Sequence, residues 1–117
     1  LPISQQVRTL LTRELNQALK DFDALITPAS PTMPWKIGAF VADPLTMYKA
    51  DLMSVGCNLA GLPGAVLPVG TTVLDGKTLP IGMQLLGRSF EEKPLIQIAH
   101  VLEQTLNVKR PLPVVLE

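Results

Sequence analysis

The chain has 117 residues, of which ten are basic, ten are acidic and 47% are hydrophobic, and its mean hydropathy is +0.31. This length suits one small domain, since ~100–150 residues is the commonest domain size. The balanced charges form no long block of one sign, which excludes the electrostatic footprint of a nucleic-acid-binding protein or a polybasic membrane anchor. No apolar run reaches the ~18 residues of a membrane span, so the composition favours a globular core.

The single cysteine, Cys57, cannot form an internal disulfide, and no cluster of cysteines and histidines has the spacing of metal ligands. We therefore expect no metal site, and the cysteine usage favours a reducing compartment. The sequence starts without an initiator methionine and enters a helical pattern almost at once. This beginning leads us to expect a fragment of a longer protein.

The first predicted element is an amphipathic helix over residues 5–22. Apolar side chains recur there at spacings of three and four, as one helix face requires, and Ser4 is the predicted N-cap. The sequence "DALIT" then predicts a short buried strand over residues 23–27. Three prolines in "PASPTMP" end this strand and begin a loop.

A second helix is predicted over residues 44–55, with Asp43 as its cap and Pro44 in its first position. Periodicity places one carboxylate, Asp51, among apolar neighbours on this helix. These neighbours, at spacings of three and four from one another, are Met47, Tyr48, Leu52 and Val55.

Two strands, over residues 65–69 and 81–87, are predicted to flank a turn at Asp75-Gly76. In "CNLAGLPGAVLPVG", residues 57–70, we interpret the glycines and prolines as structural punctuation. Asn58 and Gly61 end the segment after the Asp51 helix, and Gly64 allows a close approach of the backbone.

The last helix is predicted over residues 91–106, with Pro94 tolerated in its first turn. A tail punctuated by prolines follows over residues 109–117. The order of elements predicts an α/β layered architecture. Three strands with three helices would make a thin, open piece, so we expect part of a larger sheet. The predicted inner face of the last helix consists of Leu95, Ile98, Ala99, Leu102 and Leu106.

Nucleophilic catalysis finds little support in these residues. None of the serines lies in a G-x-S-x-G turn, and the single histidine, His100, has no neighbouring carboxylate cluster, so we interpret it as a surface residue. Cys57 lacks a local base and is interpreted as a buried structural thiol. Adjacent Glu91 and Glu92 cannot face each other on a helix and are expected to be solvated in its first turn. Trp35 is either an exposed partner anchor or a plug of the proline loop.

Asp51 is the carboxylate with two open interpretations. It is either an exposed helix residue, the usual fate of aspartate, or a fixed anion that accepts hydrogen bonds from an ammonium or amide group. Tyr48, one turn earlier, either shares that site or packs against it, and we favour packing. Periodicity alone does not choose between the two interpretations of Asp51.

Several stretches together resemble the amidase-signature family over essentially the whole chain. "NLAGLPG" followed by "LPIGMQLLG" is similar to the family as a whole, and so are "VRTLLTRELNQALKDFDALITPASPT" and "FEEKPLIQIAHVLEQTL". "DPLTMY" with an aspartate three residues later resembles, more narrowly, the A subunits of glutamyl-tRNA(Gln) amidotransferases. The resemblance implies that residues 1–117 form the C-terminal part of a single amidase domain, with a mixed sheet flanked by helices.

The resemblance also implies an activity and partners. A serine of a serine, serine, lysine triad would hydrolyse glutamine, and the ammonia would convert misacylated Glu-tRNA(Gln) to Gln-tRNA(Gln). Nothing in residues 1–117 matches the signature of that triad, so no catalytic residue is assigned here, and the chain alone is expected to be inactive. In the family the acidic residue after "DPLTMY" helps to hold the amino acid substrate, and this residue matches Asp51.

The implied partners are the B and C subunits, with ATP and magnesium used by the partner subunit rather than by this chain. Glu-tRNA(Gln) would be bound mainly through that subunit. The implied location is the bacterial cytoplasm or the interior of an organelle. Two other hypotheses stay open: another amidase-signature hydrolase of small amides, and a non-catalytic truncated module.

Overall fold

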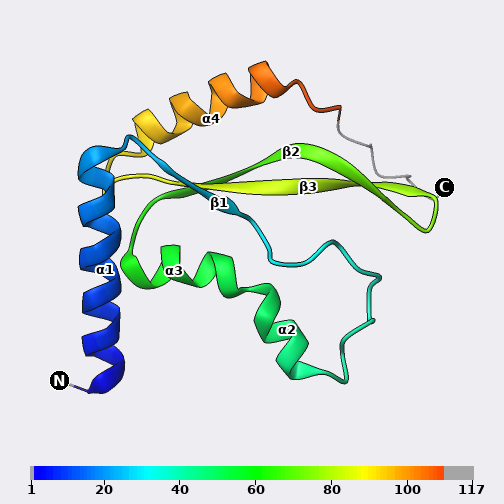
Figure 1. The fold of residues 1–117 in the computed structure, drawn as a ribbon, viewed down its shortest axis with the longest axis horizontal. Coiled ribbons are helices and arrows are strands. Elements are labelled where there is room, and N and C mark those ends of the chain that lie inside the picture. Colours follow the sequence, from blue (N-terminus) through cyan, green and yellow to red (C-terminus); the bar gives the residue numbers. More distant parts are fainter. Residues whose placement is uncertain (1, 110–117) are drawn as a thin grey trace.

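The structure, a computed structural model, describes residues 2–109. The predicted tail lies outside the described residues beyond Lys109. The α/β fold class is confirmed, since the described residues combine helices with a sheet (Figure 1). The elements are α1 (Ile3–Asp21), β1 (Leu25–Pro28), α2 (Pro44–Ala50), α3 (Leu52–Ala60), β2 (Gly64–Leu74), β3 (Lys77–Leu86) and α4 (Glu92–Leu106).

The three described strands form one antiparallel sheet in the order β1-β3-β2. β2 and β3 form a long hairpin, and the predicted turn is confirmed, since Asp75 and Gly76 both have positive φ (50° and 73°). β1 pairs only with residues 83–86 of β3. Pro80 lies beyond that stretch, where β3 has no second neighbour that would need its missing N–H.

Helices pack on both faces of the sheet, and two adjacent leucines of the central strand divide the core between them. Leu85 is fully buried with Leu67 and Leu95 on the face covered by α4. Leu86, whose side chain points to the opposite face, is buried with Leu19 of α1 and Cys57 of α3. Figure 1 shows α4 and α3 on either side of the strands, with α1 across their ends.

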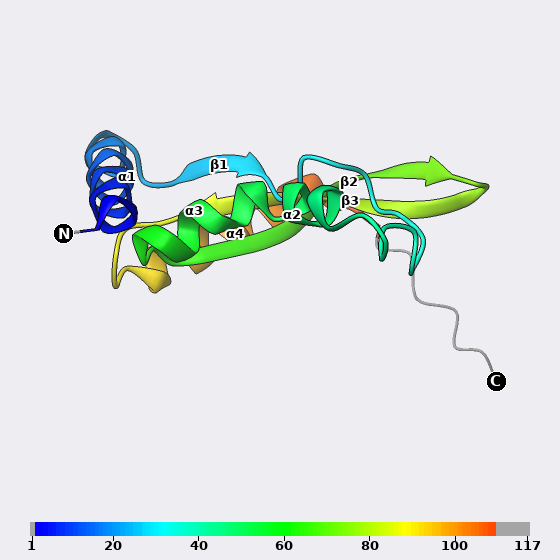
Figure 2. The same ribbon diagram turned by 90° about the horizontal axis from the view of Figure 1, so that it is seen from below.

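The molecule is thin, with extents of 51 × 39 × 22 Å (Figure 2). Its radius of gyration is 16.7 Å, whereas a compact domain of this length has a value of about 13 Å. The thin, open sheet expected from three strands is therefore observed in the described residues. None of their helices combines the length and the apolar composition needed to cross a bilayer.

One predicted helix cap and one predicted inner-face residue are wrong, both at helix ends. α1 starts at Ile3, because the carbonyl of Pro2 accepts the amides of Gln5 and Gln6 at 3.0 and 3.2 Å; Ser4 therefore lies inside the helix and is not its N-cap. At the other end of the chain, the predicted inner-face residue Leu106 is 42% exposed, because α4 ends there.

The predicted helix over 44–55 is two helices, α2 and α3, that meet at Asp51. Asp43 and Pro44 begin α2 as predicted, and the backbone amide of Thr46 donates to the Asp43 carboxylate at 3.1 Å. α3 continues through Asn58, which was predicted to end the segment. It stops at Gly61, whose φ of 67° is left-handed and typical of a helix end.

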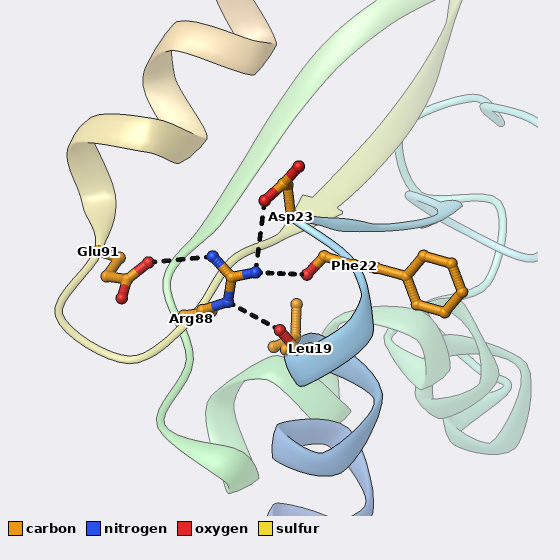
Figure 3. Close-up of polar contacts among 5 residues, drawn as sticks. All are labelled: Leu19, Phe22, Asp23, Arg88 and Glu91. Atoms are coloured by element: carbon orange, nitrogen blue, oxygen red, sulfur yellow. Dashed lines mark hydrogen bonds and ion pairs between the residues drawn. The ribbon is translucent and has the colours of Figure 1, made fainter.

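Arg88 joins α1 to the loop that follows β3 (Figure 3). Its guanidinium donates to the carbonyls of Leu19 at 2.7 Å and Phe22 at 3.1 Å, and it forms ion pairs with Asp23 and Glu91, each at 3.4 Å. The last carbonyls of a helix lack partners within it, and a cation is favoured at that end. Arg88 therefore fixes the end of α1 against the start of α4.

Candidate functional site

The junction of α2 and α3 carries the candidate site residue, Asp51. Its backbone has φ of −88° and ψ of 0°, which ends one helix and begins the next. The Asp51 amide donates to the carbonyl of Tyr48 at 3.3 Å, and its carbonyl accepts the amides of Ser54 and Val55, each at 3.1 Å. The hydroxyl of Ser54 donates to the same carbonyl at 3.0 Å. The backbone of Asp51 is thus held on both sides of the junction.

The carboxylate of Asp51 is exposed and, within residues 2–109, makes no hydrogen bond or ion pair. It stands at the N-terminus of α3, where the helix dipole favours a negative charge. A carboxylate offers only acceptor sites, and those of Asp51 have no donor within residues 2–109. The arrangement is suited to binding a cationic or amide group.

The face that α2 and α3 turn to the protein consists of small or medium side chains: Thr46, Ala50, Met53, Cys57 and Ala60 are buried or half-buried. The larger apolar residues around Asp51 are exposed instead, with Tyr48 at 79% and Leu52 at 64%. The favoured prediction that Tyr48 packs is therefore wrong. The apolar neighbours that helical spacing gives Asp51 are exposed rather than buried.

Two polar side chains from outside the helices reach the junction. The hydroxyl of Ser30, in the loop after β1, donates to the carbonyl of Ala50 at 3.5 Å. The carboxamide of Gln84, in β3, donates from Nε2 to the carbonyl of Met53 and to the hydroxyl oxygen of Thr27, each at 3.0 Å. Asp51 thus lies between the backbone carbonyls of Ala50 and Met53, and each of these carbonyls accepts a hydrogen bond from a side chain outside the two helices.

The sequence did not single out Gln84 or Arg88. For Gln84 a signal existed, since it is the polar residue in the apolar stretch "IGMQLLG". For Arg88 no local signal existed, because two of its acceptors, Leu19 and Phe22, lie 69 and 66 residues away.

Cys57 and His100 lie where the sequence predicted. Cys57 is buried, its thiol donates to the carbonyl of Leu62 at 3.0 Å, and burial raises the pKa of the thiol above its ordinary value. A protonated, buried thiol is a poor nucleophile. His100 is exposed on α4, and no serine hydroxyl in the described part of the chain hydrogen-bonds to it.

Glu91, Glu92 and Trp35 also have defined surroundings. Both glutamates are exposed at the start of α4, as predicted, and Glu91 forms the ion pair with Arg88. Trp35 is half-buried and packs edge-to-face on Phe40, with ring centroids 5.1 Å apart. This contact within the loop fits the interpretation of Trp35 as a loop plug.

No group of three or more histidine, cysteine or acidic side chains gathers in residues 2–109 with the geometry to hold a metal ion. The prediction that this chain carries no cofactor stays a prediction.

Comparison with known proteins identifies the class of this fold. The family model described as Amidase matches residues 1–96, and the chain belongs to the amidase family.

Three relatives define the resemblance more narrowly. The chain is 47% identical over 103 residues to the chloroplastic/mitochondrial A subunit of glutamyl-tRNA(Gln) amidotransferase from Arabidopsis thaliana, covering 88% of this chain and 19% of the relative. It is 48% identical over 101 residues to the A subunit of glutamyl-tRNA(Gln) amidotransferase from Oleidesulfovibrio alaskensis, covering 86% and 20%. It is 46% identical over 110 residues to the protein of that name in Prochlorococcus marinus, covering 94% and 22%.

The chain therefore spans about a fifth of the length of these curated relatives. The resemblance that the motifs indicated, to the amidase family and to these A subunits, is confirmed.

Proposed function

We propose that this chain is part of the A subunit of a glutamyl-tRNA(Gln) amidotransferase and contributes to the hydrolysis of glutamine. The observation that carries the proposal is the identity of 46–48% to proteins of that name, which extends over 86–94% of the chain. In the proposed reaction a serine oxygen attacks the side-chain amide carbon of glutamine and ammonia leaves. Water then cleaves the acyl-enzyme ester to give glutamate, and the ammonia serves to amidate Glu-tRNA(Gln).

In this proposal the serine, serine, lysine triad lies outside residues 1–117. The chain contributes a substrate-binding residue, Asp51, and the sheet and helices that hold it. Two features support this role: the carboxylate is exposed at a helix N-terminus, and it makes no hydrogen bond or ion pair within residues 2–109. An ammonium group has three donors and a carboxylate only acceptors, so Asp51 suits the α-ammonium group of glutamine.

The proposed partners are the B and C subunits of the complex. ATP and magnesium would be used by the partner subunit, which would also bind most of the Glu-tRNA(Gln). Following the relatives, which include bacterial proteins and proteins named chloroplastic/mitochondrial, we propose a bacterial cytoplasm or the interior of such an organelle as the location.

The experiment is a glutaminase assay on the full-length protein with the substitution Asp51→Asn. A lost charge-assisted hydrogen bond is worth about 1.5–3 kcal/mol, so we expect KM for glutamine to rise about 10- to 100-fold, with a smaller change in kcat. The matched control is Asp75→Asn, which removes an exposed carboxylate at the hairpin turn and should leave KM unchanged.

An unchanged KM for Asp51→Asn would remove Asp51 from the substrate site. Equal kcat/KM for glutamine and for small amides without an amino acid group would favour the alternative, another amidase-signature hydrolase.

A further inference from the structure

We propose that Gln84 is a positioning residue for Asp51, acting through the backbone of the first turn of α3. This inference rests on the proposed function, because it assigns Gln84 a part in the same substrate site. Gln84 does not touch the substrate in this account. Its carboxamide fixes the place of the carboxylate that does.

The burial of Gln84 is the first observation. It is 4% exposed, and among the buried residues of the described part of the chain it is the one polar side chain. Both of its bonds come from the same nitrogen, which donates to Thr27 Oγ1 and to the Met53 carbonyl at 3.0 Å each. Burying an amide is unfavourable unless it is hydrogen-bonded, whereas an apolar side chain of similar size would fit this apolar strand without that cost. The presence of a glutamine at this buried position is therefore explained by the hydrogen bonds that it donates to Thr27 and Met53.

The place of its acceptor is the second observation. Met53 is the second residue of α3, and Asp51 is the N-cap of that helix. On the other side of Asp51, the Ala50 carbonyl accepts the hydroxyl of Ser30 at 3.5 Å. This carbonyl needs an outside donor, because the amide of Ser54 bonds to the carbonyl of Asp51 instead. The carbonyl of Ala50, directly before Asp51, thus accepts a hydrogen bond from the loop after β1. The carbonyl of Met53, two residues after Asp51, accepts one from β3.

Fully buried side chains do not anchor this part of the chain. α2 has no buried residue, and the buried residues of α3, Cys57 and Ala60, lie in its C-terminal half. At the first turn of α3, where Met53 is half-buried, Gln84 supplies a hydrogen bond from the central strand of the sheet. Thr27 completes the link, since its hydroxyl oxygen fixes the orientation of the carboxamide.

The test is steady-state kinetics of the full-length protein with the substitution Gln84→Met, which keeps the length of the side chain and removes the donor. We expect KM for glutamine to rise about 5- to 10-fold, the equivalent of one hydrogen bond, with kcat nearly unchanged. For 4-carbamoylbutanoate, which is glutamine without its ammonium group, we expect no change in KM. A purely structural role would lower activity toward both amides alike.

The double variant Gln84→Met with Asp51→Asn should show no further increase in KM beyond that of Asp51→Asn alone, since Gln84 acts through Asp51. Additive increases would overturn the proposal, and so would an unchanged KM in Gln84→Met. If Asp51→Asn itself leaves KM for glutamine unchanged, the proposed role of Asp51 fails, a result that is distinct from a failure at Gln84 alone.

Thr27→Val provides a second variant in case Gln84→Met does not fold. It keeps the shape of the side chain and removes the acceptor that orients the carboxamide, while the bond to Met53 can still form. We expect KM for glutamine to rise about 2- to 5-fold, less than for Gln84→Met, and again only for the substrate with the ammonium group. An equal effect on both amides would contradict the inference.

Discussion

The two ends of the hairpin differ in how they are held together. At the packed end, residues 19–25, 57–67 and 83–95, lie all eight buried hydrophobic residues of the described chain. At the open end, residues 28–50 and 68–82, no residue is buried, and the contacts include the exposed Lys36–Asp75 ion pair at 2.9 Å and the edge-to-face pair of Trp35 and Phe40. Asp51, between α2 and α3, lies in the sequence between the last residue of the open end's first range and the packed end's second range.

The packed end therefore provides the stability of the fold, and the proposed binding residue, Asp51, lies outside it. A packed end gives a rigid reference, and binding residues are commonly carried on less buried segments that a rigid scaffold positions. Gln84 belongs to the packed end and reaches the first turn of α3 beside Asp51.

The largest effect is expected for Leu85→Ala. Leu85 is 0% exposed between the sheet and α4, and leucine truncations at such sites cost about 2–5 kcal/mol in the free energy of unfolding. The matched control at the open end is Val73→Ala, where the side chain is 69% exposed and a change within about 0.5 kcal/mol is expected. Urea denaturation of the full-length protein measures both. An equal loss at Val73 would contradict the contrast between the ends.

The next effect is expected for Arg88→Ala. This change removes the donors to the carbonyls of Leu19 and Phe22 at the end of α1, and each bond to a charged group contributes about 1.5–3 kcal/mol where water is excluded. Because the side chain is 35% exposed, we expect a total loss of about 2–3 kcal/mol. Arg88→Lys should restore less than half, since an ammonium cannot reach the several acceptors that the guanidinium fork does. Full recovery of the unfolding free energy in Arg88→Lys would show that only the positive charge of Arg88 matters, and would contradict the role given to its several hydrogen bonds.

A smaller and more specific effect is expected for Gly64→Ala. A Cβ at this position would lie 2.9 Å from Cys57 Sγ, inside the packed end. The overpacking should cost about 1–3 kcal/mol in unfolding free energy. Adding Cys57→Ala should relieve most of that cost, because the opposing sulfur is removed. A double-mutant cycle measures the coupling, and strictly additive losses would show that the close approach does not limit this site.

The smallest effect is expected for Asp43→Asn at the start of α2. Hydrogen bonds from the Thr46 hydroxyl and amide lower the pKa of the Asp43 carboxyl. A lowered folded-state pKa contributes stability that is present above the unfolded-state pKa and is lost as the pH falls through the folded-state pKa. The protection of the α2 amides, measured as their exchange rate relative to the intrinsic rate at the same pH, should therefore fall in acid for the native chain and depend less on pH in Asp43→Asn. An identical pH dependence in both proteins would contradict the claim that the ionised Asp43 side chain stabilises the start of α2.

Local patterns predicted much of the fold. The spacing of apolar residues predicted α1 and α4, Asp43-Pro44 predicted the start of α2, and Asp75-Gly76 predicted the hairpin turn. These features depend on residues close in sequence, so they can be read without knowing the tertiary structure.

The inner face of α2 and α3 could not be predicted in the same way. Helical spacing favoured packing of Tyr48, whereas Tyr48 is 79% exposed and smaller residues such as Ala60 are buried. The hydrogen bonds that Gln84 and Arg88 donate to backbone carbonyls join residues that are 31 to 69 positions apart. For the candidate site, the sequence and its resemblance indicated Asp51, and the tertiary structure added the side chains that hold its helix junction.

The central claim, that the Asp51 carboxylate binds the ammonium group of glutamine, is tested most directly by a calorimetric titration. The protein is the full-length chain with its nucleophilic serine replaced by alanine, and the ligands are glutamine and 4-carbamoylbutanoate. We predict that glutamine binds about 10- to 100-fold more tightly than the analogue, and that Asp51→Asn removes most of this preference. A preference that is unchanged in Asp51→Asn would contradict the account.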